Sequence, residues 1–257
     1  MGLAPEVAQN RQELHVQVLT IERTADRCSH NFAPTRKEPE MFNAENNAEP
    51  VLSIGAFRTS REFRRLGILV EDGSSSMTEA GPGNMTKAHA VDFATRELLT
   101  RVKVSRKVKN FDFAVVTYDG EASVHTGPTP AETIDDDASY DPTVGHGGGT
   151  DIGAGLEKAR EMAEAFLAQA PAGGVPNGVV IVVMSDGECG NPGNTWQVAA
   201  SIKSGPHGSR ITICSALFAG VGEPNPVAEG LLREISTDPF HFRTSCDASA
   251  LRRFLAV

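Results

Sequence analysis

Three short polar segments of this sequence carry oxygen-bearing side chains at close spacing. The first is Asp-Gly-Ser-Ser-Ser at residues 72–76, which presents one Asp and two Ser at alternate positions. The second is the glycine-rich run at residues 145–151, and the third is Ser-Asp-Gly at residues 185–187. Carboxylate and hydroxyl oxygens are hard ligands that suit Mg²⁺, Mn²⁺ or Ca²⁺. The candidate metal ligands are Asp72, Ser74, Ser76, Thr150 and Asp186.

This ligand set would leave room for a further group on the metal. Mg²⁺ takes roughly six oxygens in octahedral array at about 2.0–2.1 Å. Two carboxylates and three hydroxyls cannot fill that shell if the two Asp side chains act partly through water. We therefore expect at least one open coordination position.

The elements that must position these side chains alternate along the chain from residue 65 onward. Apolar runs of strand length are followed by segments with helical spacing of apolar residues, a pattern typical of a parallel sheet covered on both faces by helices. The expected strands are 66–70, 111–118, 122–126, 179–184, 211–217 and 240–242. The expected helices are 86–100, 152–168, 195–203, 227–235 and a last one from Asp247, which is a plausible N-cap.

The predicted fold class is therefore α/β, a doubly wound, mostly parallel central sheet flanked by helices. In open α/β sheets, ligands bind beyond the carboxyl ends of the strands. The Asp-Gly-Ser-Ser-Ser and Ser-Asp-Gly segments each follow an expected strand directly, and the glycine-rich run leads into an expected helix. The three segments are thus expected to meet at one edge of the sheet.

In this order, the segments resemble the metal-ion-dependent adhesion site (MIDAS) of von Willebrand factor type A (VWA) domains. The resemblance covers about 190 residues and includes Gly-Gly-Thr-Asp-Ile-Gly-Ala-Gly-Leu at residues 148–156. It implies that Asp72, Ser74, Ser76, Thr150 and Asp186 hold Mg²⁺, and that a Glu or Asp of a partner protein completes the metal's shell. The commonest family form has Thr-Ser-Gly between the Asp and the last Ser, whereas Gly-Ser-Ser stands here and keeps every ligand.

The resemblance defines the expected domains, a VWA domain at residues 65–257 and an N-terminal extension at residues 1–64. Residues 14–21 and 51–57 have strand-like patterns, and residues 24–50 are rich in Asn, Glu and Pro. Similarity to intracellular bacterial VWA proteins suggests an ATPase, kinase or phosphatase complex as partner, which is an analogy at the level of the fold.

Other interpretations of the same residues stay open. Ser74 and Ser76 could be helix N-caps or a nucleophile, although no Gly-x-Ser-x-Gly elbow is present. A Mg²⁺-dependent phosphoryl hydrolase of the haloacid dehalogenase type would need Asp-x-Asp, where Ser74 stands. A metal-free scaffold is the third alternative. We expect Asp151 to be a cap or outer group and His146 to be solvated or near the metal. We expect the acidic residues before the glycine-rich run to form a solvated loop, although they could recruit a cation or a basic partner; they are Asp135, Asp136, Asp137 and Asp141.

Composition excludes several classes of function. The formal net charge of −9 disfavours nucleic acid as a partner, because such binding depends on Lys and Arg displacing counterions. The longest apolar run, residues 179–184, is far shorter than the roughly 20 residues that cross a bilayer. The N-terminus shows neither a basic start nor an apolar signal segment, so we expect a cytoplasmic protein without a membrane span. We expect reduced thiols at all four cysteines, Cys28, Cys189, Cys214 and Cys246.

Overall fold

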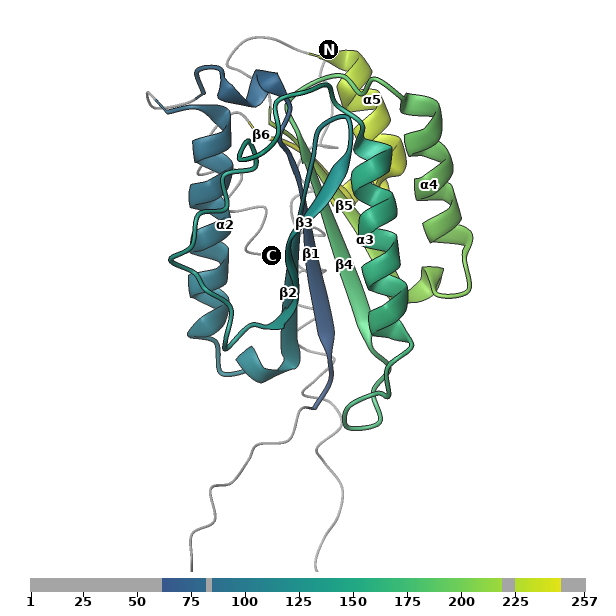
Figure 1. The fold of residues 1–257 in the computed structure, drawn as a ribbon. Coiled ribbons are helices and arrows are strands. Elements are labelled where there is room, and N and C mark those ends of the chain that lie inside the picture. The colour runs from purple at the N-terminus through teal and green to yellow at the C-terminus, as the bar shows by residue number, and fades with distance from the viewer. Residues whose placement is uncertain (1–61, 82–84, 219–224, 246–257) are drawn as a thin grey trace, which may run out of the picture. The chain divides into compact units, whose positions relative to one another are not determined.

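The computed structural model describes residues 62–81, 85–218 and 225–245. Six strands form one sheet in the order β3-β2-β1-β4-β5-β6 (Figure 1). All neighbouring strands are parallel except β3, which runs antiparallel to β2. The strands are β1 (Arg65–Asp72), β2 (Phe111–Tyr118), β3 (Ala122–Pro130), β4 (Gly178–Ser185), β5 (Ile211–Phe218) and β6 (Phe242–Ser245).

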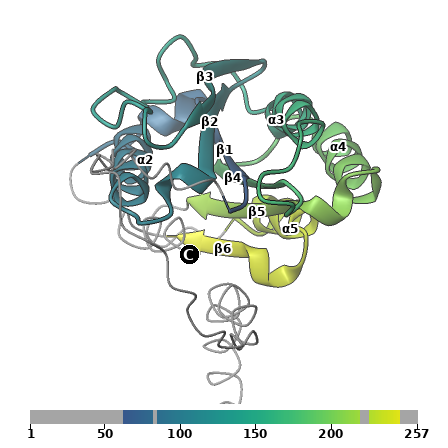
Figure 2. The same ribbon diagram turned by 90° about the horizontal axis from the view of Figure 1, so that it is seen from below.

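Helices cover both faces of this sheet, as Figure 2 shows from below. Helix α2 (Lys87–Lys103) lies on one face. On the other face lie α3 (Ile152–Leu167), α4 (Pro192–Ser204) and α5 (Pro226–Ile235). The middle of strand β1 is apolar at consecutive positions because both of its faces are buried. Ile68 and Val70 pack into the core beneath α3, whereas Leu69 packs into the core beneath α2.

Side-chain caps define the starts of the four helices. Thr86 Oγ1 accepts a hydrogen bond from His89 N at 3.1 Å before α2, and Asp151 Oδ1 accepts one from Ala154 N at 3.2 Å before α3. Asn191 and Asn225 cap α4 and α5 in the same way. Such residues satisfy backbone N–H groups that have no partner within a helix. Asp151 is thus a cap, as the sequence predicted.

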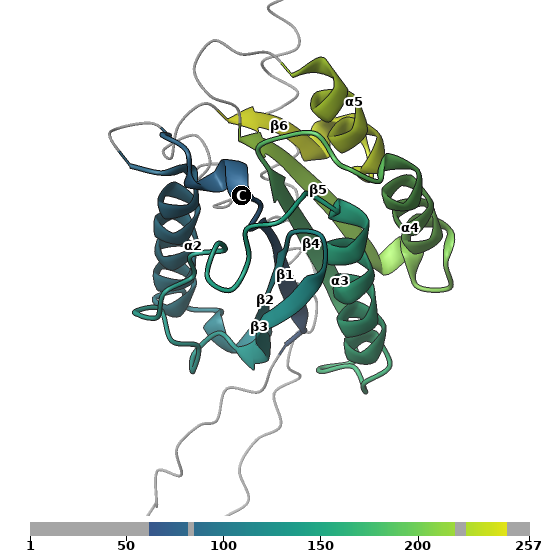
Figure 3. The same cartoon turned by 45° about the horizontal axis from the view of Figure 1, so that its top comes forward.

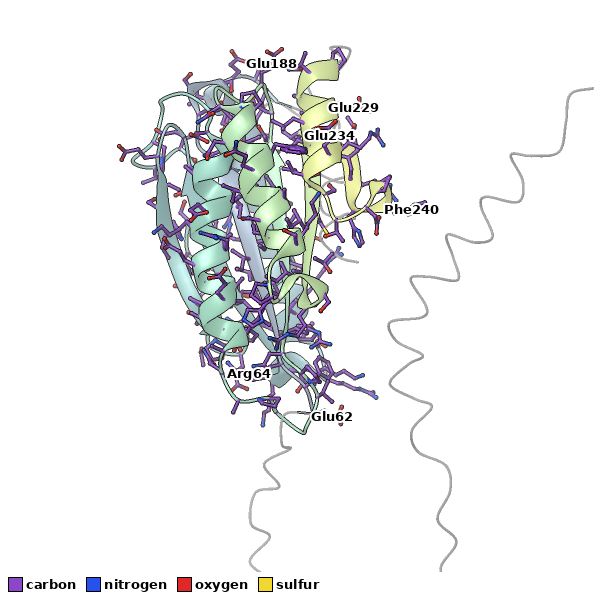
Figure 4. All side chains as sticks on the ribbon, turned by 90° about the vertical axis from the view of Figure 1, so that its right-hand side faces the viewer. Glu62, Arg64, Glu188, Glu229, Glu234 and Phe240 are labelled. Atoms are coloured by element: carbon purple, nitrogen blue, oxygen red, sulfur yellow. The ribbon has the colours of Figure 1, made fainter. Side chains whose placement is uncertain are left out.

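The carboxyl ends of the parallel strands gather at one end of the molecule. In Figure 4, Glu188 in the loop after β4 marks this end, and Arg64 before β1 marks the opposite end. We call the end marked by Glu188 the carboxyl edge. The three polar segments singled out in the sequence lie there.

The structure confirms the predicted fold class and most of the elements, and it corrects several element ends. Helix α2 continues to Lys103 instead of residue 100, and α4 begins at Pro192 instead of residue 195. Strand β3 continues beyond the expected residue 126 to Pro130. Residues 239–241 form a 3-10 turn, η5 (Pro239–His241), and the strand expected at residues 240–242 instead begins at Phe242. The strand-like residues 14–21 and 51–57 and the helix expected from Asp247 lie outside the described residues.

Two observations bear on the composition argument. No helix within the described ranges is long and apolar enough to span a bilayer. Cys189 and Cys214 are free thiols, and the other two cysteines are outside the described residues. Burial raises the pKa of the Cys214 thiol to about 12.

Candidate metal centre

The candidate ligands from β1 and β4 lie at the topological switch point of the sheet. β1 and β4 are neighbours, and the chain leaves them toward opposite faces, to α2 after β1 and to α4 after β4 (Figure 3). Asp72 is the last residue of β1, and Asp186 directly follows β4. Open α/β sheets bind ligands at such switch points, beyond the carboxyl ends of the strands.

A continuous chain of polar contacts joins these two carboxylates. Ser74 N donates to Asp72 Oδ1 at 2.9 Å, and Ser74 Oγ lies 3.1 Å from Ser76 Oγ. Ser76 Oγ in turn donates to Asp186 Oδ1 at 2.8 Å. Four of the five expected ligands are therefore within hydrogen-bonding reach of the next one.

Asp72 is the most buried member of this chain. Its side chain is inaccessible to solvent, and Ser185 Oγ donates to Asp72 Oδ2 at 2.7 Å. Burial raises the pKa of the Asp72 carboxyl above its usual value, the hydrogen bonds from Ser74 and Ser185 oppose this shift, and the nearby Asp186 carboxylate adds to it. A cation beside the two carboxylates would favour their charged forms.

The fifth expected ligand, Thr150, lies in the loop before α3. Backbone hydrogen bonds join this loop to the other two: Ser75 N donates to Gly148 O at 3.3 Å, and Gly190 N donates to Thr150 O at 2.7 Å. Thr150 is therefore attached to the loop that carries Asp186. Its side chain is partly exposed, and backbone contacts with both neighbouring loops place it at the carboxyl edge.

Gly73 lets two of these loops approach closely. Its backbone N–H donates to Tyr118 O at 2.6 Å. A Cβ added to Gly73 would lie 2.2 Å from Pro142 O and 2.9 Å from His146 Cβ, distances that real atoms do not tolerate. The glycine between Asp72 and Ser74 is thus required by packing.

Asp119, which follows β2, holds the glycine-rich loop in place. Its Oδ2 accepts hydrogen bonds from Gly147 N at 3.1 Å and Gly148 N at 3.0 Å. Burial works in the opposite direction, but these bonds, with those from Glu121 and His146, lower the pKa of the Asp119 carboxyl to about 2. Asp119 therefore stays ionised and stabilises the conformation of the loop.

His146 is not solvated, which corrects the first of the two expectations for this residue. Its side chain is 9% exposed. Its Nε2 lies 2.9 Å from Thr117 Oγ1 and 3.0 Å from Ser123 Oγ. The ring is thus a structural link between the loop and strands β2 and β3, and it does not activate Ser74 or Ser76 as a base.

The acidic residues before this loop are only partly solvated. Asp135 and Asp137 are exposed, as expected. Asp136 instead forms an ion pair with Lys103 in the last turn of α2.

Sequence reasoning missed two polar groups at the site. Ser185 belongs to the Ser-Asp-Gly segment, but nothing in its spacing indicated the bond to Asp72. Lys87 was not expected at the site; its Nζ lies 2.7 Å from Asp186 Oδ2 and 3.1 Å from Glu79 Oε2. The contacts of Ser185 and Lys87 join residues about a hundred positions apart in sequence.

The donors at the carboxyl edge are oxygen atoms, which are suitable ligands for a divalent cation. Across the described part of the chain, no three His, Cys, Asp or Glu side chains are grouped closely enough to hold a metal by themselves. A cation at the carboxyl edge would therefore depend on hydroxyls together with two carboxylates. That combination of oxygens suits Mg²⁺, Mn²⁺ or Ca²⁺.

The sequence matches no protein-family model, and no curated protein is significantly similar to it. Solved structures are similar in fold. The pilus adhesin SpaC from Lactobacillus rhamnosus GG superimposes with a TM-score of 0.61 at 12% identity, covering 76% of this chain and 30% of SpaC. The vWF domain of the type V pili tip protein Mfa5 from Porphyromonas gingivalis gives a TM-score of 0.52 at 16% identity, covering 76% of this chain and 94% of that domain.

A third similar structure is proximal thread matrix protein 1 (PTMP1) from the mussel byssus, described as having a zinc-occupied MIDAS motif. Its TM-score is 0.51 at 18% identity, covering 76% of this chain and 45% of PTMP1. This chain thus spans less than half of SpaC and of PTMP1. Likeness at these identities shows the fold alone, and the chain has an α/β VWA-like fold.

Proposed function

We propose that this chain is a metal-dependent protein-interaction module. Asp72, Ser74, Ser76, Thr150 and Asp186 hold a divalent cation, for which Mg²⁺ is the first candidate. A Glu or Asp side chain of a partner protein binds the open position on that cation. The module is not an enzyme in this proposal.

The observation that carries the proposal is the chain of contacts from Asp72 through Ser74 and Ser76 to Asp186. It places two carboxylates and two hydroxyls together at the switch point of the sheet, with Asp72 fully buried. A buried carboxylate is costly unless it is paired or bound to a metal. Hydrogen bonds from Ser74 and Ser185 compensate Asp72 in part, and a cation would complete that compensation.

The proposed partner chemistry follows from charge. Three of the five proposed ligands are neutral hydroxyls, so the open position on the cation favours a further anionic oxygen. A carboxylate on the partner meets that demand and gives directional specificity. Adhesin and pilus-tip proteins among the similar structures support an interaction role, and the zinc-occupied motif of PTMP1 supports a divalent cation.

Two further expectations remain predictions. An ATPase, kinase or phosphatase complex is the partner expected from intracellular bacterial relatives, and the expected location is cytoplasmic. The similar structures described above are pilus and byssus proteins, so they support neither the expected partner nor the expected location.

Mn²⁺ can test the open position because it is paramagnetic and reports the exchange of its bound water. We expect the chelator-stripped chain to bind Mn²⁺ and to enhance the relaxation of water protons. Acetate, as the probe for a partner's carboxylate, should reduce that enhancement in the millimolar range. Asp72→Asn combined with Asp186→Asn should abolish the enhancement, whereas exposed Glu234→Gln, a control on α5, should behave as the wild type.

The outcomes separate the alternatives. Enhancement that acetate leaves unchanged would show a metal site whose open position does not accept a carboxylate from outside the chain. Equal, weak enhancement in all three proteins would favour the metal-free scaffold. Mg²⁺-dependent release of phosphate from p-nitrophenyl phosphate that disappears on Asp72→Asn would favour the phosphoryl hydrolase, and we expect none.

A further inference from the structure

Lys87 pairs with one of the candidate metal ligands. It is the first residue of α2, and its Nζ lies 2.7 Å from Asp186 Oδ2. The other oxygen of the same carboxylate, Oδ1, accepts the hydrogen bond from Ser76. The Asp186 side chain is 0% exposed and that of Lys87 is 12% exposed. One buried carboxylate is thus divided between the candidate cation site and an ammonium group.

The helix gives no reason for a lysine at this place. A positive charge at the N-terminus of a helix opposes the macrodipole, which favours anions there. The Lys87 ammonium instead lies between two carboxylates, with Nζ 2.7 Å from Asp186 Oδ2 and 3.1 Å from Glu79 Oε2. The position of the ammonium is therefore explained by the carboxylates around it.

The charge balance indicates what Lys87 does. Asp72 and Asp186 contribute two negative charges when ionised, and Lys87 offsets one of them. The ammonium therefore supplies to Asp186 part of the neutralisation that a divalent cation would bring. Glu79 Oε2 lies 3.1 Å from the same Nζ, and its side chain is 67% exposed, so the ammonium keeps a partner if it leaves Asp186.

We propose that Lys87 is an internal counter-ion that competes with the divalent cation for Asp186, so that the cation binds weakly and displaces the ammonium toward Glu79 when it does. This inference rests on the proposed cation site. It assigns to Lys87 the tuning of cation affinity. Because this coupling is reciprocal, the Lys87 ammonium weakens cation binding at Asp186, and a bound cation weakens the Lys87–Asp186 ion pair by the same factor.

Two variants test the competition by titration calorimetry with Mg²⁺ and with Mn²⁺. Lys87→Met keeps most of the apolar stem and removes the charge, and it should bind the cation at least about tenfold more tightly, which corresponds to ~1.4 kcal/mol. Lys87→Arg keeps the charge and should bind about as weakly as the wild type. Circular dichroism in the presence of chelator establishes that each variant is folded.

Chemical labelling of the wild-type protein provides a second readout, which would not respond to Mg²⁺ if Lys87 had a purely structural role. A water-soluble acylating reagent followed by mass spectrometry reports how accessible each lysine amine is. Saturating Mg²⁺ should increase the acylation rate of Lys87 several-fold over the rate in chelator. Lys158, which is paired with Glu161 on α3, is the internal control and should not change.

The results distinguish failure of this inference from failure of the proposed function. Tighter binding by Lys87→Met than by the wild type supports the competition. Equal or weaker binding by Lys87→Met, with wild-type binding intact, overturns the competition and leaves the cation site standing. No binding by the wild type or by either variant overturns both.

Discussion

Glu71→Gln should stabilise the protein progressively as the pH rises. The Glu71 side chain is fully buried next to Asp72 in β1, and its Oε1 accepts a hydrogen bond from Thr95 Oγ1 at 2.6 Å. Its Oε2 is buried without a hydrogen-bond partner among the described residues. Burial raises the pKa of Glu71 from 4.5 to about 8, the Thr95 bond opposes this, and the Asp92 and Asp141 charges add to it.

The sign follows from the proton balance. Between pH 4.5 and 8 the folded state keeps a proton on Glu71 that the unfolded state has lost, so the stability contributed by this group falls as the pH rises. The folded-state and unfolded-state pKa values of Glu71 differ by about 3.5 units, and each unit corresponds to ~1.4 kcal/mol. The full penalty above the folded pKa is therefore on the order of 5 kcal/mol.

Urea denaturation in the presence of chelator measures this effect. The difference in free energy of unfolding between Glu71→Gln and the wild type should grow by several kcal/mol from pH 5 to pH 9. Glutamine retains the size of the side chain and an oxygen to accept the Thr95 bond. Exposed Glu161→Gln is the control and should show no comparable trend. A difference that does not change with pH would refute the reasoning.

Three other predictions concern the packing and hydrogen bonding around the site. Gly73→Ala would put Cβ 2.2 Å from Pro142 O, so it should destabilise the fold by roughly 1–3 kcal/mol and abolish Mg²⁺ binding. Gly187→Ala, with no atom within 4 Å of the added Cβ, should change neither stability nor Mg²⁺ binding. Urea denaturation measures the stability, and calorimetry measures the binding. Ser185→Ala removes the 2.7 Å hydrogen bond to Asp72 and should weaken Mg²⁺ binding roughly 10–100-fold, while exposed Ser201→Ala should not; equal affinities would contradict an orienting role for Ser185. Gly155→Ala would bring Cβ to 2.7 Å from Val70 Cγ1 and should lower the melting temperature, whereas Gly230→Ala in α5, where the space is open, should raise stability by ~0.5–1 kcal/mol. A higher melting temperature for Gly155→Ala would show that α3 can move away from β1.

The central strands and the starts of α2, α3 and α5 were predictable because their causes are local. β1 and β4 are parallel strands buried on both faces, which requires nearly continuous apolar runs. Thr86 and Asp151 indicate where helices begin because their side chains accept hydrogen bonds from backbone N–H groups of the first turn. The polar segments after β1 and β4 could be assigned to one edge because parallel strands share the direction of their ends.

What the sequence did not indicate depends on contacts over long separations or on competing local chemistry. Lys87 meets Asp186 only because α2 begins beside the end of β4, and no spacing rule predicts that. The strand expected at residue 240 begins at Phe242 because Asp238 and Pro239 first form a capped turn. Phe93 shares the helical spacing of the buried Ala90 and Ala94, yet it is 42% exposed, since α2 turns this residue away from the core.

The position of Asp119 at the carboxyl edge could have been predicted from the sequence. It follows a buried strand and precedes Gly120, so the rule that drew attention to Asp72 and Asp186 applies to it as well. Its function at the edge of the sheet is to hold the glycine-rich loop, and only the structure shows its bonds to Gly147 and Gly148.

The central claim is that the carboxyl edge binds a divalent cation, and isothermal titration of Mg²⁺ into the chelator-stripped chain tests it most directly. The comparison is with the Asp72→Ala, Asp186→Ala double variant and with the Glu234→Gln control. The account predicts saturable binding at one site in the wild type and the control, and none in the double variant. Binding that survives in the double variant, or its absence from all three proteins, would contradict the account.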